Sequence, residues 1–121
     1  MHRVSRDWVE GTQGGSGTAD GATWLTWDST NAWTTAGGDF APVASSTLEV
    51  DDALAYYTWT GAGLVADVQA WLDDDTTNFG WILIGEEDEP GNARRFDSRE
   101  TENEAFRPVL TIVHDELPEE R

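Results

Sequence analysis

Residues 80–85 read Gly-Trp-Ile-Leu-Ile-Gly, a continuous apolar run with a glycine at each end. A short run of this kind is typical of a β-strand that is buried on both faces. Other short stretches are rich in β-branched and aromatic residues and are separated by turn residues, which also predicts strands. The further predicted strands are residues 4–10, 23–27, 55–60, 94–99 and 109–114.

One stretch has the periodicity of a helix. Residues 64–72 read Leu-Val-Ala-Asp-Val-Gln-Ala-Trp-Leu, which places Leu64, Val68, Trp71 and Leu72 on one face. A helix of two to three turns is too short to be stable alone, so we expect tertiary packing to hold it. The predicted fold class is therefore all-β, a jelly-roll-like antiparallel β-sandwich with one short helix.

The composition restricts the domain count and the partners. A chain of 121 residues is expected to form a single domain. It has 7 basic residues, all arginine, against 24 acidic ones, for a net charge of −17. This charge argues against nucleic-acid and anionic-membrane binding, because both rely on basic side chains. No apolar run is long enough for membrane insertion, and the absence of cysteine excludes disulfides and thiolate metal sites.

Short aromatic and glycine motifs follow one another from about Val4 to His114. In order, they are residues 6–11 (ending W-x-E-G), 21–24 (G-x-T-W), 33–40 (W-x-x-x-G-G-D-F), 57–59 with the helix at 65–71, 78–81, 96–100 and 107–110. Their order and spacing resemble the C-terminal two-thirds of the DNRLRE-type domain, which is similar to carbohydrate-binding module family ninety-six. The resemblance implies a jelly-roll sandwich and a non-catalytic extracellular or cell-surface module that binds polysaccharide.

Compared with that family, the chain lacks the first strands of the sandwich. Residues 1–121 are therefore expected to form one β-sandwich domain with unpaired edges, and such edges bind other strands. The missing strands are either absent from a fragment or supplied by rearranged pairing or a neighbouring subunit. In the last case the chain is a structural subunit of an extracellular fibre or surface layer. Its pairing edges are then residues 4–10 or 109–114.

The seven tryptophans are the main candidates for ligand binding, because indole rings stack on the apolar faces of sugars. Four lie in apolar strand or helix patterns and are predicted to be core residues: Trp8, Trp24, Trp71 and Trp81. Three lie at strand ends or beside loops and are candidate sugar platforms, with loop anchoring as the alternative: Trp27, Trp33 and Trp59.

Charged residues provide two further candidate sites. Arg94 and Arg95 can bind uronic-acid carboxylates, since guanidinium groups pair with carboxylates in a bidentate way. Asp39, Asp73 and Asp75 are candidate ligands for Ca²⁺, which prefers carboxylate oxygens. A solvated acidic surface is the alternative interpretation.

Other charged residues favour structural roles. Arg99 beside Glu100, and Arg107, are expected to form ion pairs that hold the last strands. Catalysis has little support, because His2 and His114 lie at opposite ends of the chain. The acidic run at 86–89 shows no sign of a cleft that would raise a carboxyl pKa. The sequence therefore predicts that the chain is not an enzyme.

Overall fold

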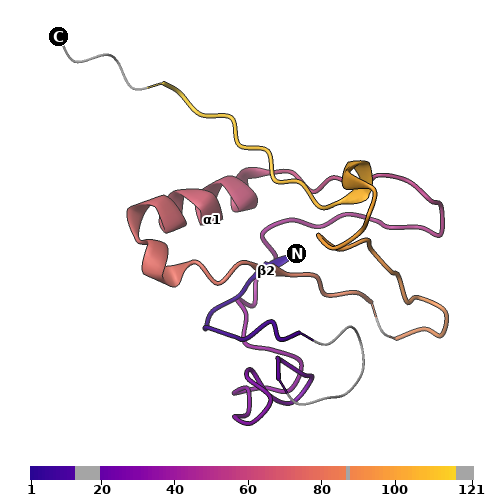
Figure 1. Cartoon of the computed structure of the whole chain (residues 1–121). Coiled ribbons are helices and arrows are strands. Elements are labelled where there is room, and N and C mark those ends of the chain that lie inside the picture. The colour runs from indigo at the N-terminus through magenta and orange to yellow at the C-terminus, as the bar shows by residue number, and fades with distance from the viewer. Residues whose placement is uncertain (13–19, 87, 117–121) are drawn as a thin grey trace.

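The computed structural model describes residues 1–12, 20–86 and 88–116. Figure 1 shows α1 lying across the body of the molecule, with the β1–β2 pair below it and the loops of the N-terminal third beneath the pair. The elements in chain order are β1 (His2–Arg3), α1 (Ala62–Asp73), a 3₁₀ helix η1 (Asp75–Thr77), β2 (Trp81–Ile82) and a second 3₁₀ helix η2 (Glu104–Phe106).

The sheet consists of β1 and β2, which pair antiparallel. His2 lies opposite Ile82, and Arg3 lies opposite Trp81. Pairing continues briefly past β1, where the Val4 N–H donates to the Gly80 carbonyl at 2.9 Å. The other side of this segment contacts residues 39–41 through the bridge of Val4 to Phe40. The N-terminal segment thus lies between two others that come from distant parts of the sequence.

The predicted helix at 64–72 is confirmed as α1, which begins two residues earlier and ends one later. Gly63 allows its first turn to lie against the preceding loop, because a Cβ there would come within 2.1 Å of the Ser45 carbonyl oxygen. The helix ends at Asp73. Asp74 is extended, and its side chain accepts the Thr76 N–H, which begins the 3₁₀ turn η1.

The core is small and lies between α1 and β2. Trp71 of α1 is only 8% exposed, and its ring centroid is 4.6 Å from that of Trp81. The Arg3 guanidinium lies 5.9 Å from the Trp71 ring centroid. In the part of the chain that is described, Val4 and Trp71 are the buried hydrophobic residues. A core of this size leaves most apolar side chains in contact with solvent.

The predicted jelly-roll sandwich is wrong. Within the described residues the structure has one two-stranded sheet and isolated bridges, not two packed sheets. Most predicted strands are irregular or extended without a ladder: residues 5–10, 23–25, 55–60, 94–99 and 109–114. β-propensity favours extended backbone, but a strand also needs a partner whose N–H and C=O groups are aligned with its own. These segments have extended character without that partner.

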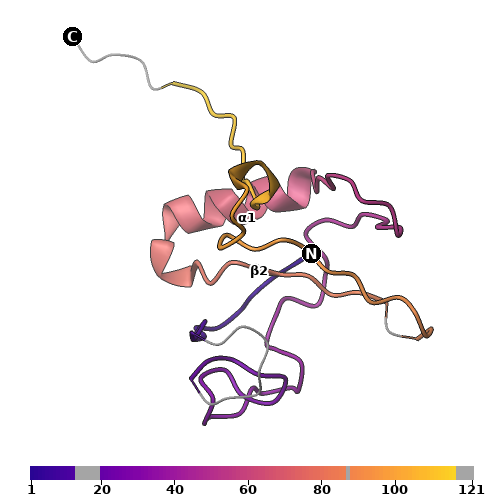
Figure 2. The same ribbon diagram turned by 45° about the vertical axis from the view of Figure 1, so that its right-hand side comes forward.

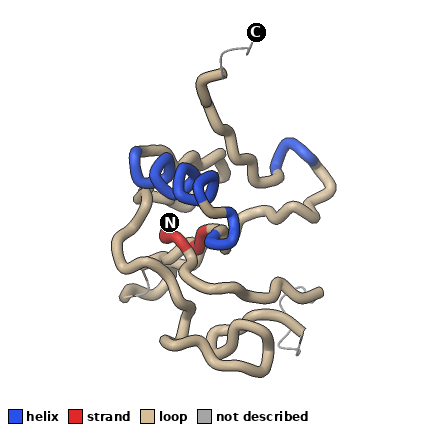
Figure 3. Tube along the Cα trace, turned by 90° about the vertical axis from the view of Figure 1, so that its left-hand side faces the viewer, coloured by secondary structure: helices blue, strands red, loops and turns tan. Residues whose placement is uncertain are grey.

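The accessible surface is correspondingly large. The chain exposes 9979 Å², whereas a compact monomer of its mass exposes about 6,500 Å². The excess is about 3,500 Å² on one chain, whereas an interface of standard size buries about 800 Å² on each partner. Figures 2 and 3 show part of the reason: the trace leading to the C-terminus runs away from α1 without lying against another segment.

Candidate functional site

Residues 107–116, which we call the C-terminal segment, contain four large apolar side chains that are exposed within a short stretch. Side chains on both of its faces are accessible: Val109 and Val113 are 81% and 95% exposed, and Leu110 and Ile112 are 59% and 51% exposed. Large apolar side chains rarely gather on the surface of a monomer without a binding role. The segment is therefore the first candidate for a functional surface.

The base of the C-terminal segment is fixed to the body. Arg107 donates from Nε to the Thr101 carbonyl at 2.8 Å, and its own N–H bonds the Glu104 carbonyl at 3.2 Å. The η2 turn before it is held by Tyr56, whose hydroxyl donates to the Ala105 carbonyl at 2.9 Å. Arg107 has extended dihedral angles, with φ −70° and ψ 149°. The segment therefore leaves the body from a defined point and in a defined direction.

The backbone of the C-terminal segment is available for pairing. Within residues 1–12, 20–86 and 88–116, no backbone–backbone hydrogen bond involves residues 108–116. Unpaired N–H and C=O groups along extended apolar backbone are the features that recruit another β-strand. The unpaired backbone groups and the exposed side chains together make this segment a candidate for pairing with a β-strand of another polypeptide.

The candidate sugar platforms occupy two separate places. Trp27 and Trp33 belong to one loop, in which the Trp33 indole N–H donates to the Thr23 carbonyl at 2.9 Å. The Arg6 guanidinium lies 4.2 Å from the Trp27 ring centroid and covers one face of that ring. Trp59 instead packs edge-on against Phe96, with centroids 5.9 Å apart. All three rings are half-buried.

Two of the four predicted core tryptophans are surface residues. Trp71 is buried as predicted and Trp81 is half-buried, but Trp8 is exposed and Trp24 is 62% exposed. One face of the Trp24 ring lies against Gly37, where a Cβ would come within 2.9 Å of the ring. Trp24 borders a shallow hollow of about 310 Å³. The hollow is lined by Trp24, Ala36, Gly37, Phe40, Ile84, Gly85, Glu86 and Asp88.

Arg94 is occupied by backbone carbonyl groups. Its Nε donates to the Asp51 carbonyl at 2.9 Å, and its Nη1 donates to the carbonyls of Gly91 and Ala93 at 3.1 and 3.0 Å. These bonds fix a loop and leave fewer donors for a ligand carboxylate. Arg95 is exposed.

The three aspartates predicted to bind calcium lie in different local settings. Asp39 accepts the backbone N–H groups of Thr34 and Thr35 at 3.0 and 3.1 Å. Partial burial acts to raise its pKa, but these donors and the Arg6 charge outweigh it, so the pKa lies below the ordinary value. Asp73 accepts from Gln69 on α1, and Asp75 begins η1. The described residues contain no cluster of three or more potential metal ligands.

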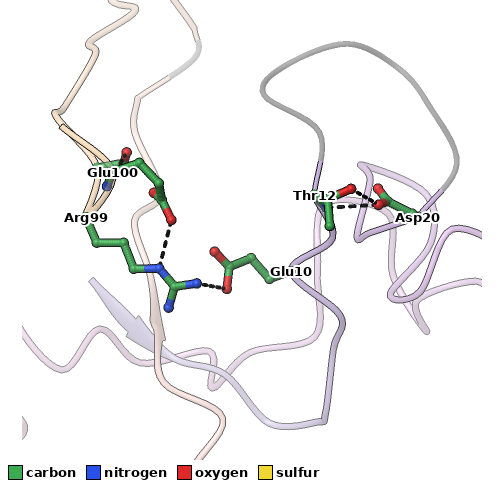
Figure 4. Close-up of polar contacts among 6 residues, drawn as sticks. Glu10, Thr12, Asp20, Arg99 and Glu100 are labelled. Carbon is green, nitrogen blue, oxygen red and sulfur yellow. Dashed lines mark hydrogen bonds and ion pairs between the residues drawn. The ribbon is translucent and has the colours of Figure 1, made fainter. Parts of the chain in front are cut away.

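Arg99 joins two distant parts of the chain, as Figure 4 shows. Its guanidinium is 3.0 Å from Glu10 and 2.9 Å from Glu100, so the predicted Arg99–Glu100 ion pair is confirmed. In the same view the Thr12 N–H donates to Asp20 Oδ2 at 3.0 Å. Arg107 also forms an ion pair, with Glu104 at 3.8 Å. In the acidic run at 86–89, Glu87 lies outside the described residues.

No helix in the described parts of the chain is long and apolar enough to cross a membrane. Comparison with known proteins finds no matching family model, no similar curated protein and no similar solved structure.

Proposed function

We propose that the chain is a structural subunit that assembles by pairing its C-terminal segment with a β-strand of another polypeptide. The observation that carries this proposal is the combination of exposed apolar side chains and unpaired backbone in residues 108–116. Strand addition uses both features, because main-chain hydrogen bonds give affinity and alternate side chains give specificity.

The accessible area supports an associated state. The excess surface of about 3,500 Å² on one chain is larger than the area of about 800 Å² that each partner buries in an interface of standard size. Conformational entropy opposes the ordering of an extended segment, so burial of its apolar side chains must compensate. A partner strand supplies that burial, and an isolated chain does not.

The other predicted edge, residues 4–10, already forms backbone hydrogen bonds with other segments of the same chain. Val4 bonds Gly80, and Val9 donates to the Trp27 carbonyl at 2.9 Å while its own carbonyl accepts the Ala22 N–H at 2.7 Å. Its backbone is therefore less available than that of the C-terminal segment, and we assign the pairing edge to residues 107–116.

Light scattering on a paired set of variants tests the proposal. Val109→Lys/Val113→Lys places two charges on the segment, and lysine on an edge opposes strand pairing. Val65→Lys/Leu72→Lys is the matched control, because it makes the same change in charge at two exposed apolar positions of α1. We expect the unaltered chain to exceed monomer mass, the segment variant to associate at least tenfold more weakly, and the control to associate at least as strongly as the unaltered chain. A monomeric unaltered chain, or equal losses in both variants, contradicts the proposal.

A second candidate function is polysaccharide binding, and the open face of Trp24 favours it. This ring borders the shallow hollow that Glu86 and Asp88 also line. An indole face and carboxylate acceptors fit the apolar face and hydroxyl groups of a neutral sugar. Titration of a neutral glucan and of a polyuronate, followed by Trp fluorescence, tests this. Trp24→Ala should abolish binding of the neutral polymer, while Trp59→Ala should leave it unchanged; binding that survives Trp24→Ala excludes this hollow.

A further inference from the structure

We propose that the partner strand is the C-terminal segment of a second copy of this chain, paired antiparallel with Thr111 on the two-fold axis. This inference rests on the proposed function and deepens it by naming the partner and the register. In this arrangement Val109 lies opposite Val113 of the second copy, and Leu110 lies opposite its Ile112. Arg107 lies opposite its Asp115.

Symmetry restricts the register. Adjacent residue pairs of an antiparallel ladder alternate between hydrogen-bonded and non-hydrogen-bonded geometry. A two-fold axis must therefore pass midway between one residue and its own copy. An axis between two successive pairs would make a hydrogen-bonded pair equivalent to a non-hydrogen-bonded one. Within the exposed stretch the axis can lie on Leu110, Thr111 or Ile112.

Charge complementarity selects Thr111. With the axis there, Arg107 faces Asp115 of the second copy, and the same pair forms again at the other end of the ladder. An axis on Leu110 places Arg107 opposite Val113 instead. An axis on Ile112 places Val109 opposite Asp115. The register on Thr111 is thus the one that flanks an apolar centre with opposite charges on both sides.

Pro108 fits the same register. If the two Thr111 residues form a hydrogen-bonded pair, the bonded positions are Val109, Thr111 and Val113, and none of their N–H groups has a backbone partner in the described residues. The ladder ends at Arg107, because its N–H already bonds the Glu104 carbonyl. Pro108 then falls at a non-hydrogen-bonded position, where its missing N–H costs nothing in the ladder.

The side chains also match across the interface. On one face of the two-stranded ladder, Val109, Thr111 and Val113 lie beside the same three residues of the second copy. β-Branched side chains are therefore cross-strand neighbours. The other face pairs Leu110 with Ile112. The two most exposed apolar side chains of the segment, Val109 and Val113, therefore become cross-strand neighbours.

Disulfide trapping tests the register, because the chain has no cysteine of its own. Opposed Cα atoms of a hydrogen-bonded pair are about 5.5 Å apart, within the range that a disulfide spans. Thr111→Cys should therefore form a covalent dimer under mild oxidation. Val109→Cys and Val113→Cys are matched controls, since each lies about 14 Å along the ladder from its own copy. Neither should cross-link alone, but an equimolar mixture of the two should.

The outcomes separate this inference from the proposed function. If the unaltered chain associates but Thr111→Cys cross-links no faster than Val109→Cys, the register is wrong and assembly through strand pairing stands. If the unaltered chain is monomeric in light scattering and no variant cross-links, both proposals fail. Cross-linking by Thr111→Cys together with the Val109→Cys and Val113→Cys mixture establishes both.

Discussion

The indole N–H of Trp81 donates to Asp67 Oδ2 at 2.7 Å, and this bond connects β2 to the middle of α1. It is partly shielded from solvent, beside the contact of Trp81 with Trp71. Helix and sheet are thus held together by one polar and one aromatic contact of the same indole ring.

Replacing Asp67 by alanine should loosen this connection. The indole N–H then loses its acceptor, and we expect the free energy of unfolding to fall by about 1–2 kcal/mol. Asp67→Asn keeps an acceptor and should lose less. Urea unfolding gives both values, and Asp73→Ala is the control, because Asp73 accepts only from the exposed Gln69 among the contacts of the described residues. Equal effects at positions 67 and 73 contradict the role of the Trp81 bond.

Trp71 has a buried indole N–H with no hydrogen-bond partner in the described part of the chain. Trp71→Ala removes the largest buried side chain and should cost about 3–5 kcal/mol. Trp71→Phe keeps most of the aromatic contact and removes the unsatisfied donor, so it should cost clearly less. Thermal or urea unfolding of the two variants tests this, and a phenylalanine variant as unstable as the alanine variant would be inconsistent with the packing described.

The loop at 28–31 should be sensitive to acid. The Asn31 backbone N–H, together with the Asn31 side chain and the Thr30 N–H, holds the pKa of Asp28 below its ordinary 3.8. A depressed carboxyl pKa contributes stability that is present above the unfolded value and is lost as pH falls through the folded value. NMR titration should show the amide signals of Thr30 and Asn31 shifting below pH 3.8. Asp28→Asn should abolish that shift, and a midpoint above the ordinary value contradicts it.

Charge exchange provides a test of the paired segment that does not depend on cysteine. Asp115→Arg reduces the net negative charge of the chain, so general repulsion between copies alone predicts tighter association. The Thr111 register predicts weaker association, by several-fold, because two arginines then face each other at both ends. Arg107→Asp should also associate more weakly, although it removes the contacts of Arg107 with Thr101 and Glu104 as well. The register is therefore tested by the equimolar mixture of the two variants, which should form heterodimers.

Sedimentation velocity of the separate and mixed variants measures how strongly each variant self-associates and whether the mixture forms heterodimers. Asp97→Arg is the control, because it makes the same change in charge at an exposed residue outside the segment. It should not weaken association. If Asp115→Arg behaves like this control and mixing produces no heterodimer, Arg107 and Asp115 do not face each other.

Local signals in the sequence predicted the helix but not the sheet. Leu64, Val68 and Trp71 recur with helical spacing, and helical hydrogen bonds form within one continuous stretch, so periodicity alone was sufficient. Strand pairing depends on residues far apart in sequence. His2 pairs with Ile82, and nothing near either residue indicates the other.

The candidate site shows the same distinction. The apolar character of residues 109–114 is evident from the sequence. Whether these residues have a strand to pair with depends on where the rest of the chain lies. The strand-prone neighbours of Trp24 predict that its side chain is buried. The structure turns it toward solvent, where Gly37 supports one face of the ring. Glycines near an aromatic residue are a signal that could have indicated a loop platform instead of a core.

The scarcity of buried apolar side chains has a consequence for how much of the protein is needed. If a second chain completes the structure, folding and association form a single equilibrium, and mass action makes the melting temperature rise with the amount of protein present. Dilution alone would then unfold the chain. Abundance would decide whether the subunit exists in an ordered form at all, and a cell could switch assembly on by synthesis rate without any ligand or modification.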